Sequence, residues 1–295
     1  MVKVGVNLMR AQEFTGGSVE GLLELARLAD EKGVDEVHIS DHLAISRSGF
    51  ERHGHFPFPL DYPGWFEPMA LLSAVAAVTK TVRLSTNVLI SPVRPALLLA
   101  KQIATLDVIS HGRADLAFGV SWHMEEYQAA GMPFEGRYGH MEEQIAACRV
   151  LWAGGPATFK GERIQFEDLY CLPVPAQGPR VPIALGLPPT ERNLGRMVRA
   201  ADGWFPAPLP IEDWKAAAAL VRGAYQAAGR DPKTISLRAA LDLAPPQSKS
   251  LDEVFAEAPP LIAAGATTIV AHPHVACRSR SDWSGFIDRL VALKG

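Results

Sequence analysis

Cysteine is scarce in this sequence. The chain of 295 residues has three, Cys148, Cys171 and Cys277, and they are widely separated. An odd number without a C-x-x-C pair excludes a disulfide-stapled scaffold and the common zinc and redox motifs. We interpret all three as ordinary small apolar residues of a protein in a reducing cytoplasm.

Long apolar runs and blocks of like charge are missing too. No uninterrupted apolar stretch is long enough to cross a bilayer, and residues 1–9 lack the charged and apolar regions of a secretory leader. The net charge is -3, the sequence pI is about 6.3, and the two signs are well mixed. We therefore expect a cytoplasmic protein that acts on a small molecule and binds neither nucleic acid nor a membrane.

Several sharp motifs are also absent. The sequence has no G-x-G-x-x-G, no phosphate-binding P-loop and no H-E-x-x-H. The segment 119–121 begins like a nucleophile elbow, but His123 stands where the second glycine belongs, which disfavours a serine hydrolase. Two H-x-H pairs lack an obvious third and fourth ligand, so we expect no metal site, with a metallohydrolase as a minor alternative. These pairs are His53 with His55 and His272 with His274.

What the sequence does contain is a regular alternation of strands and helices. Alternating units predict parallel strand pairing, and eight units in about 250 residues favour one closed (β/α)8 TIM barrel of the α/β class over residues 1–295. The alternative, a doubly wound open sheet, would want a glycine-rich first turn, which is missing. The expected strands are 3–9, 34–40, 82–90, 113–120, 181–186, 203–207, 234–243 and 267–272. The expected helices are 18–32, 66–79, 95–108, 139–152, 190–201, 211–228, 250–264 and 282–293.

Two segments interrupt this alternation. Residues 43–64 have no clear period and predict a long loop after the second strand, of the kind that forms a lid. Its aromatic residues are Phe50, Phe56, Phe58 and Tyr62. Residues 157–168 alternate around Lys160-Gly161-Glu162 and predict a β-hairpin inside an insertion of about residues 154–180.

Two of the expected helices are unusual for the outside of a barrel. Residues 66–79 and 95–108 are apolar on nearly every face, whereas a surface helix needs a polar side. A second subunit is the simplest cover, so we expect a symmetric homodimer built on these two helices. The alternative is that long loops of the same chain cover them.

Polar residues collect where the expected strands end. In a barrel these carboxyl ends meet at one face, and a few polar groups among apolar walls are typical of a small-molecule or cofactor pocket. At Asp41-His42 the alternatives are a catalytic carboxylate with its imidazole, or a capping residue beside an incidental histidine. Thr190 either caps its helix or helps the helix N-terminus to bind a phosphate. The further candidates are Thr86, Asn87, Val88, Gly119, Val120, Ser121, Gly186, Leu187 and His272.

Most of the chain resembles the luciferase-like monooxygenase superfamily, the (β/α)8 barrels that use flavin or the deazaflavin F420. The resemblance rests on the order and spacing of several segments. They are LARLADEKGVDEVHISDH, VRLSTNVL, LLLAKQIATLD, GRADLAFGVSWHMEEYQAAGMPF, LWAGGPATFKGERIQFEDL, VPIALG and AADGWFP. Within the superfamily, Ser40-Asp41-His42 is similar to the F420-dependent branch, whereas the FMN branch more often has Glu-His-His there.

The resemblance implies a role for each candidate. Asp41 and His42 would face the deazaflavin, with His42 as proton donor or acceptor. A non-prolyl cis peptide between Asn87 and Val88 would back the ring. Residues 119–121 would line the cofactor, and 186–190 would lie near its phosphate tail. Trp122 departs from luciferase, which carries an arginine there against the FMN phosphate, and 186–189 read Gly-Leu-Pro-Pro where many members have Gly-Gly.

The leading hypothesis is an F420-dependent oxidoreductase that moves a hydride between the deazaflavin and a small organic substrate. The second is an FMN-dependent two-component monooxygenase that takes reduced flavin from a separate reductase and activates O2. The third is a barrel that binds flavin without turnover.

Overall fold

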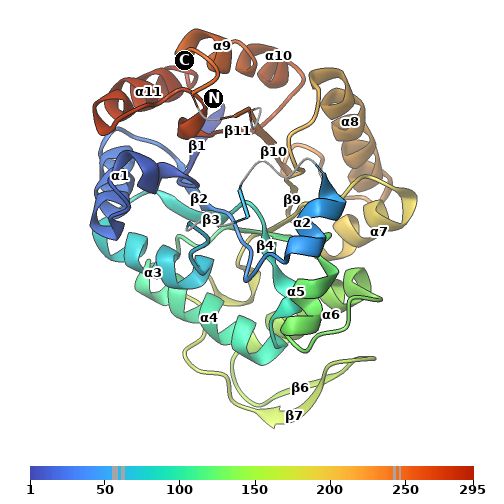
Figure 1. The fold of residues 1–295 in the computed structure, drawn as a ribbon. Helices are drawn as coiled ribbons and strands as arrows, with labels where there is room; N and C mark the ends of the chain where they lie inside the picture. The colour runs from blue at the N-terminus through green and yellow to red at the C-terminus, as the bar shows by residue number, and fades with distance from the viewer. Residues whose placement is uncertain (55–58, 61–63, 242–243, 246) are drawn as a thin grey trace.

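The chain forms a parallel β-barrel surrounded by helices (Figure 1). The computed structural model describes residues 1–295 except 55–58, 61–63, 242–243 and 246. Phe56, Phe58, Tyr62 and His55 of the sequence analysis therefore lie outside the described residues.

The barrel strands follow the order β3-β2-β1-β11-β10-β9-β8-β5-β4, with every pairing parallel. Leu84 closes the ring by bridging to Ala114, because its N–H donates to Arg113 O and its carbonyl accepts from Asp115 N. The strands are β1 Lys3–Asn7, β2 Glu36–Ile39, β3 Arg83–Thr86, β4 Leu89–Ile90, β5 Leu116–Gly119, β8 Ile183–Leu185, β9 Gly203–Trp204, β10 Ser236–Ala240 and β11 Thr268–Ala271. The predicted (β/α)8 barrel is thus confirmed.

Helices cover the outside of this barrel (Figure 1). Local capping sets their ends: Ser18 Oγ accepts from Gly21 N at the start of α1, and Gly33 follows its end with φ 86°. The outer helices are α1 Val19–Glu31, α3 Pro68–Val78, α4 Ala96–Ile109, α6 Arg137–Trp152, α7 Glu191–Ala200, α8 Ile211–Ala227, α9 Leu251–Phe255, α10 Ala258–Ala263 and α11 Arg280–Ala292.

Two predicted elements are each divided in the structure. The strand expected over 82–90 becomes β3 and β4, separated by Asn87 and Val88. The helix expected over 250–264 becomes α9 and α10. Pro259 and Pro260 account for the second break, because proline has no N–H for a helix interior but fits a helix start.

Two short helices occupy stretches that the sequence analysis left as loops. Helix α2, Arg47–His53, lies in the segment after β2, and α5, Met124–Ala129, follows β5. Short 3-10 helices complete the connections: η1 Ala11–Phe14, η2 Ser91–Val93, η3 Gly178–Arg180 and η4 Pro273–Val275. These loop helices matter because both α2 and α5 lie beside the functional site.

The predicted hairpin is present as β6 Ala157–Lys160 and β7 Gln165–Leu169, which pair antiparallel outside the ring of helices (Figure 1). Next to it, one side of α4 is exposed in this chain, where Leu97 and Leu98 are 51% and 50% exposed and Val108 and Ile109 are also exposed. The described loops therefore leave this apolar face of α4 uncovered.

Candidate functional site

A cavity of about 490 Å³ opens where the barrel strands end. Its wall brings together candidates from the ends of five strands, and its volume is typical of a small-molecule or cofactor pocket. The sequence-predicted residues in the wall are Asp41, His42, Asn87, Val88, Gly119, Val120, Ser121, Gly186, Leu187 and His272.

Two sequence candidates lie outside this wall. Thr86 is fully buried, and its hydroxyl donates to Ala117 O and accepts from Ala117 N, so it ties β3 to β5. Thr190 Oγ1 accepts from Asn193 N at the start of α7, which is the capping alternative raised for this residue.

Val88 projects into the cavity wall between two glycines. The bond from Asn87 to Val88 is cis, as the resemblance implied. A Cβ added to Gly119 would lie 2.5 Å from Val88 Cγ2, and one added to Gly186 would lie 2.9 Å from Val88 Cγ1. The glycines are therefore needed to make room for Val88, which lines the cavity between them.

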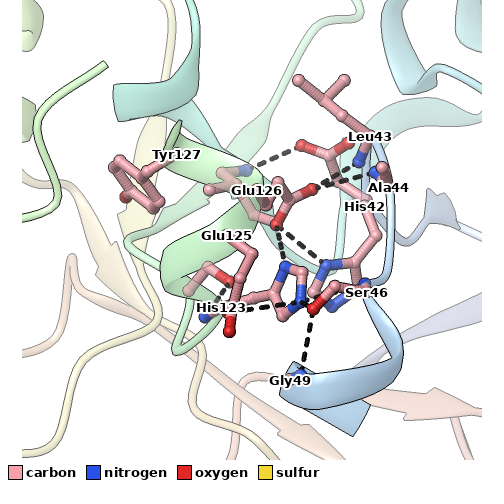
Figure 2. Close-up of polar contacts among 12 residues, drawn as sticks. His42, Leu43, Ala44, Ser46, Gly49, His123, Glu125, Glu126 and Tyr127 are labelled. Carbon is pink, nitrogen blue, oxygen red and sulfur yellow. Dashed lines mark hydrogen bonds and ion pairs between the residues drawn. The ribbon is translucent and has the colours of Figure 1, made fainter. Parts of the chain in front are cut away.

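His42 is held in the cavity wall by Glu126 of α5 (Figure 2). Its Nδ1 lies 3.1 Å from Glu126 Oε2, and the other oxygen, Oε1, accepts from the backbone N–H groups of Leu43 and Ala44. A carboxylate only accepts, so the proton of a neutral His42 is on Nδ1 and proton exchange with a ligand falls to Nε2. Glu126 was not among the sequence candidates.

The segment that carries His42 is also fastened through α2 (Figure 2). His123 Nε2 accepts from Ser46 N, 3.1 Å away, and one terminal nitrogen of Arg52 donates to both carboxylate oxygens of Glu125, at 2.8 and 2.7 Å. Gly49 permits this close packing, because a Cβ there would lie 2.2 Å from His123 Nε2. Burial lowers the pKa of His123, which favours the neutral ring that can accept these bonds.

Asp41, the residue before His42, forms a buried ion pair with Arg94. Its Oδ1 and Oδ2 accept from the two terminal nitrogens of Arg94 at 3.0 and 2.6 Å, and Oδ2 also accepts from Ile90 N at 2.8 Å. Burial alone would lower the pKa of Arg94, but the charges and hydrogen bonds of Asp41 and Glu67 together outweigh it, so the pKa is raised. Both carboxylate oxygens of Asp41 are thus engaged by groups of the protein itself.

One end of the cavity carries a cation that the sequence analysis did not single out. Arg137 begins α6 and is the one lysine or arginine in the described cavity wall. Its Nε donates to Ser121 O at 3.3 Å, and its guanidinium carbon lies 3.7 Å from the centre of the Phe134 ring. Arg137 lines the cavity together with Ser121 and Gly186. Its positive charge makes this end suitable for an anionic group such as a phosphate.

The side near α2 is aromatic. The ring centres of Trp65 and Trp122 lie 4.9 and 5.9 Å from that of His42, and His53 lies 4.3 Å from Trp122. These rings line the cavity beside His42 and offer apolar faces to a bound molecule.

Two buried histidines after β11 make an acid sensitivity predictable. Burial, followed by the charges of His274 and His38, lowers the pKa of His272 to about 3, and burial followed by the charge of Arg10 lowers that of His274 to about 4. Below pH 6.5 the unfolded chain therefore binds protons at these two histidines, whereas the folded chain binds them only near pH 3 to 4. The free energy of unfolding falls as the pH falls from about 6.5 toward 4. We expect a loss of about 2 kcal/mol per histidine between pH 7 and pH 5.

Urea unfolding of the wild type and of His272→Phe at pH 7 and at pH 5 measures this loss of stability. The variant should lose about 2 kcal/mol less than the wild type on acidification. An equal loss in both proteins would contradict the assignment.

Together these features define a (β/α)8 barrel with an enzyme-like cavity, whose wall holds an oriented imidazole and one arginine. Among the described residues, no group of three or more His, Cys, Asp or Glu side chains is placed to hold a metal ion. Among the described residues, no helix is both long and apolar enough to span a membrane.

The luciferase-like monooxygenase family matches residues 2–289, and the chain belongs to this family. It is therefore a luciferase-like oxidoreductase. An uncharacterised protein of Mycobacterium tuberculosis is 34% identical over 218 residues, which are 72% of this chain and 77% of that protein. An F420-dependent glucose-6-phosphate dehydrogenase of Gordonia bronchialis is 34% identical over 191 residues, 62% of this chain and 52% of the relative.

Solved structures agree on the fold. A monooxygenase from Streptomyces bottropensis superimposes with a TM-score of 0.76 at 23% identity, covering 99% of this chain and 100% of the other. An F420-dependent secondary alcohol dehydrogenase with an F420-acetone adduct gives 0.77 at 16% identity, covering 99% and 98%.

Proposed function

We propose that this chain is an F420-dependent oxidoreductase that transfers a hydride between the deazaflavin and a small organic substrate. The observation that carries the proposal is His42, oriented by Glu126 in the wall of a cofactor-sized cavity. F420-dependent relatives support it, among them the Gordonia bronchialis enzyme at 34% identity.

The residues present fit such a cofactor. Its ring would lie against Val88, and its phosphate would lie near Ser121, Gly186 and Arg137, the cationic end of the cavity. When bound, the deazaflavin supplies or accepts the hydride, which is the cofactor's own chemistry.

The chain's own residues supply the rest of the reaction. His42 exchanges a proton at Nε2 with the substrate oxygen while Glu126 fixes the ring through Nδ1. The ion pair of Asp41 with Arg94 fixes the strand end that carries His42. His53 of α2, with Trp65 and Trp122, lines this side of the cavity and limits the access of water.

The proposal is tested by titrating the purified protein with F420 and, in parallel, with FMN, each oxidised and reduced. We expect tight binding of F420 and weaker binding of FMN. Tight binding of reduced FMN alone would overturn the proposal in favour of the two-component monooxygenase fed by a separate reductase. Binding of F420 without turnover of any ketone or alcohol would favour a flavin-binding barrel without catalysis.

Removing the carboxylate that orients His42 should slow catalysis without abolishing it. We expect Glu126→Gln to lower kcat at least tenfold and to leave KM nearly unchanged. Leu43 N and Ala44 N would bind the amide oxygen, so the amide NH2 would face Nδ1 and favour the tautomer with its proton on Nε2. Imidazole ¹⁵N chemical shifts should show an Nδ1–H form in the wild type and an Nε2–H form in the variant. Glu125→Gln, at the neighbouring position, is the matched control and should keep the wild-type tautomer.

We also propose that the chain forms a symmetric homodimer through α3 and α4. The exposed apolar residues of α4 support it, since Leu97, Leu98, Val108 and Ile109 form an uncovered face. We expect Leu98→Glu to convert a dimer into a monomer in sedimentation velocity, and Leu220→Glu, on exposed α8, to leave the assembly unchanged. A wild-type monomer at micromolar concentration would contradict the proposal.

The location we propose is the cytoplasm. The three cysteines are all free and buried, which suits a reducing compartment.

A further inference from the structure

His272 is the most unusual group in the cavity that the mechanism above does not use. It follows β11, is 1% exposed, and lines the cavity. Neither ring nitrogen makes a hydrogen bond of good geometry in the described chain, although the backbone of Leu241 lies near enough to the ring to oppose part of the lowering of its pKa. A buried polar group without a partner costs free energy, so such a group beside a cavity points to a ligand.

The imidazole of His272 is neutral over the physiological range. Burial is the main cause that lowers its pKa to about 3, and the charges of His274 and His38 add to it. A neutral imidazole offers one donor and one acceptor and no charge. It therefore suits a hydroxyl or carbonyl group and does little for a carboxylate or phosphate.

The hydroxyl of Ser40 is a second polar group on this side of the cavity, and Asn7 holds it there. Asn7 of β1 is in register with His38 of β2, and one residue before it Val6 pairs with Ala271, the residue before His272. Asn7 Nδ2 donates to Ser40 Oγ at 3.1 Å, and the Ser40 hydroxyl, which lines the cavity, accepts this bond and keeps its own hydrogen for a ligand. His272 and Ser40 thus stand on either side of β1.

His272 lies apart from the cationic end of the cavity. It follows β11, and Ser40 and His42 follow β2, the two strands that flank β1, whereas Gly186 follows β8, three strands from β11 in the order of the sheet. Neighbouring strands are about 4.8 Å apart, so the ends of β11 and β2 are about 10 Å apart. One substrate can therefore span from His42 to His272 while the cofactor phosphate lies near Gly186 and Arg137.

We propose that His272, with Ser40, binds a second uncharged oxygen of the substrate. This inference rests on the proposed function for the reaction at His42 and adds the substrate class. The substrate is a flat, uncharged molecule with the reacting carbonyl or hydroxyl near His42 and another hydroxyl or carbonyl on the far side. The rings of Trp65 and Trp122 pack against its apolar body.

A matched pair of probes tests this: 1-tetralone, which has one oxygen, and 4-hydroxy-1-tetralone, which has a second. Binding is measured by tryptophan fluorescence, with and without F420, so it does not depend on turnover. We expect the wild type to bind the hydroxyketone about fivefold more tightly. His272→Phe should abolish that preference, and His272→Gln, which keeps a donor and an acceptor, should retain most of it. His274→Gln is the control variant and should keep the preference.

Equal affinity of the wild type for the two ketones, or binding of neither, would overturn the inference. So would a His272→Phe variant that keeps the preference, or one that loses affinity for F420 itself, since the histidine would then serve the cofactor. A preserved preference in a protein that does not bind F420 would instead overturn only the proposed function.

Discussion

Replacing His42 by alanine is expected to lower kcat by about 10²- to 10³-fold, the range that a positioned acid or base contributes. The imidazole is the group of the cavity wall that is oriented for proton exchange, with Nδ1 held 3.1 Å from Glu126 Oε2. Steady-state turnover of F420 with a ketone or alcohol substrate measures the loss, and the affinity for F420 should change little.

Two controls separate chemistry from folding. The thermal midpoint of His42→Ala should stay close to that of the wild type, and added imidazole should restore part of the activity by entering the space that the side chain vacates. A variant with at least half of the wild-type kcat would remove His42 from the proton-transfer role.

The second large effect concerns stability. Asp41→Ala should lower the free energy of unfolding by about 3 kcal/mol, because it leaves the buried Arg94 guanidinium with one carboxylate, Glu67, whose Oε1 lies 3.0 Å away. Urea unfolding followed by circular dichroism measures the change.

Asp288→Ala is the matched control, since this carboxylate pairs with Lys32 at the surface and is 62% exposed. It should change stability by less than about 0.5 kcal/mol. The double variant Asp41→Leu with Arg94→Met removes both charges and should recover much of the loss. A loss below about 1 kcal/mol in Asp41→Ala would show that the pair does not hold the strand end.

Periodicity in the sequence was enough to predict the barrel. Period and caps located helices such as α1, where Ser18 and Gly33 mark the two ends. The split of the helix over 250–264 was missed although Pro259 and Pro260 were visible, because the apolar pattern continues across them. Helix α2 was missed because seven residues, Arg47–His53, are too few to show a helical period.

The site was harder to predict, because contacts between side chains far apart in the sequence leave no local pattern. His42 and Ser121 could be predicted because each follows a predicted strand, and a barrel brings the ends of its strands together. Glu126 lies 84 residues after His42, and nothing in its surroundings marks it, apart from two acidic residues opening a short helix. Arg94 and Arg137 were missed for the same reason, since each acts through a partner on another element.

The most direct test of the proposed function follows the hydride itself. Reduced F420 labelled with deuterium at its hydride-bearing carbon is incubated with the protein and 4-hydroxy-1-tetralone under ¹⁸O2, and the products are analysed by mass spectrometry. Hydride transfer predicts a diol that carries one deuterium and no ¹⁸O. A product without deuterium would contradict hydride transfer from F420, and a product that contains ¹⁸O would identify the protein as an oxygen-activating member of its family.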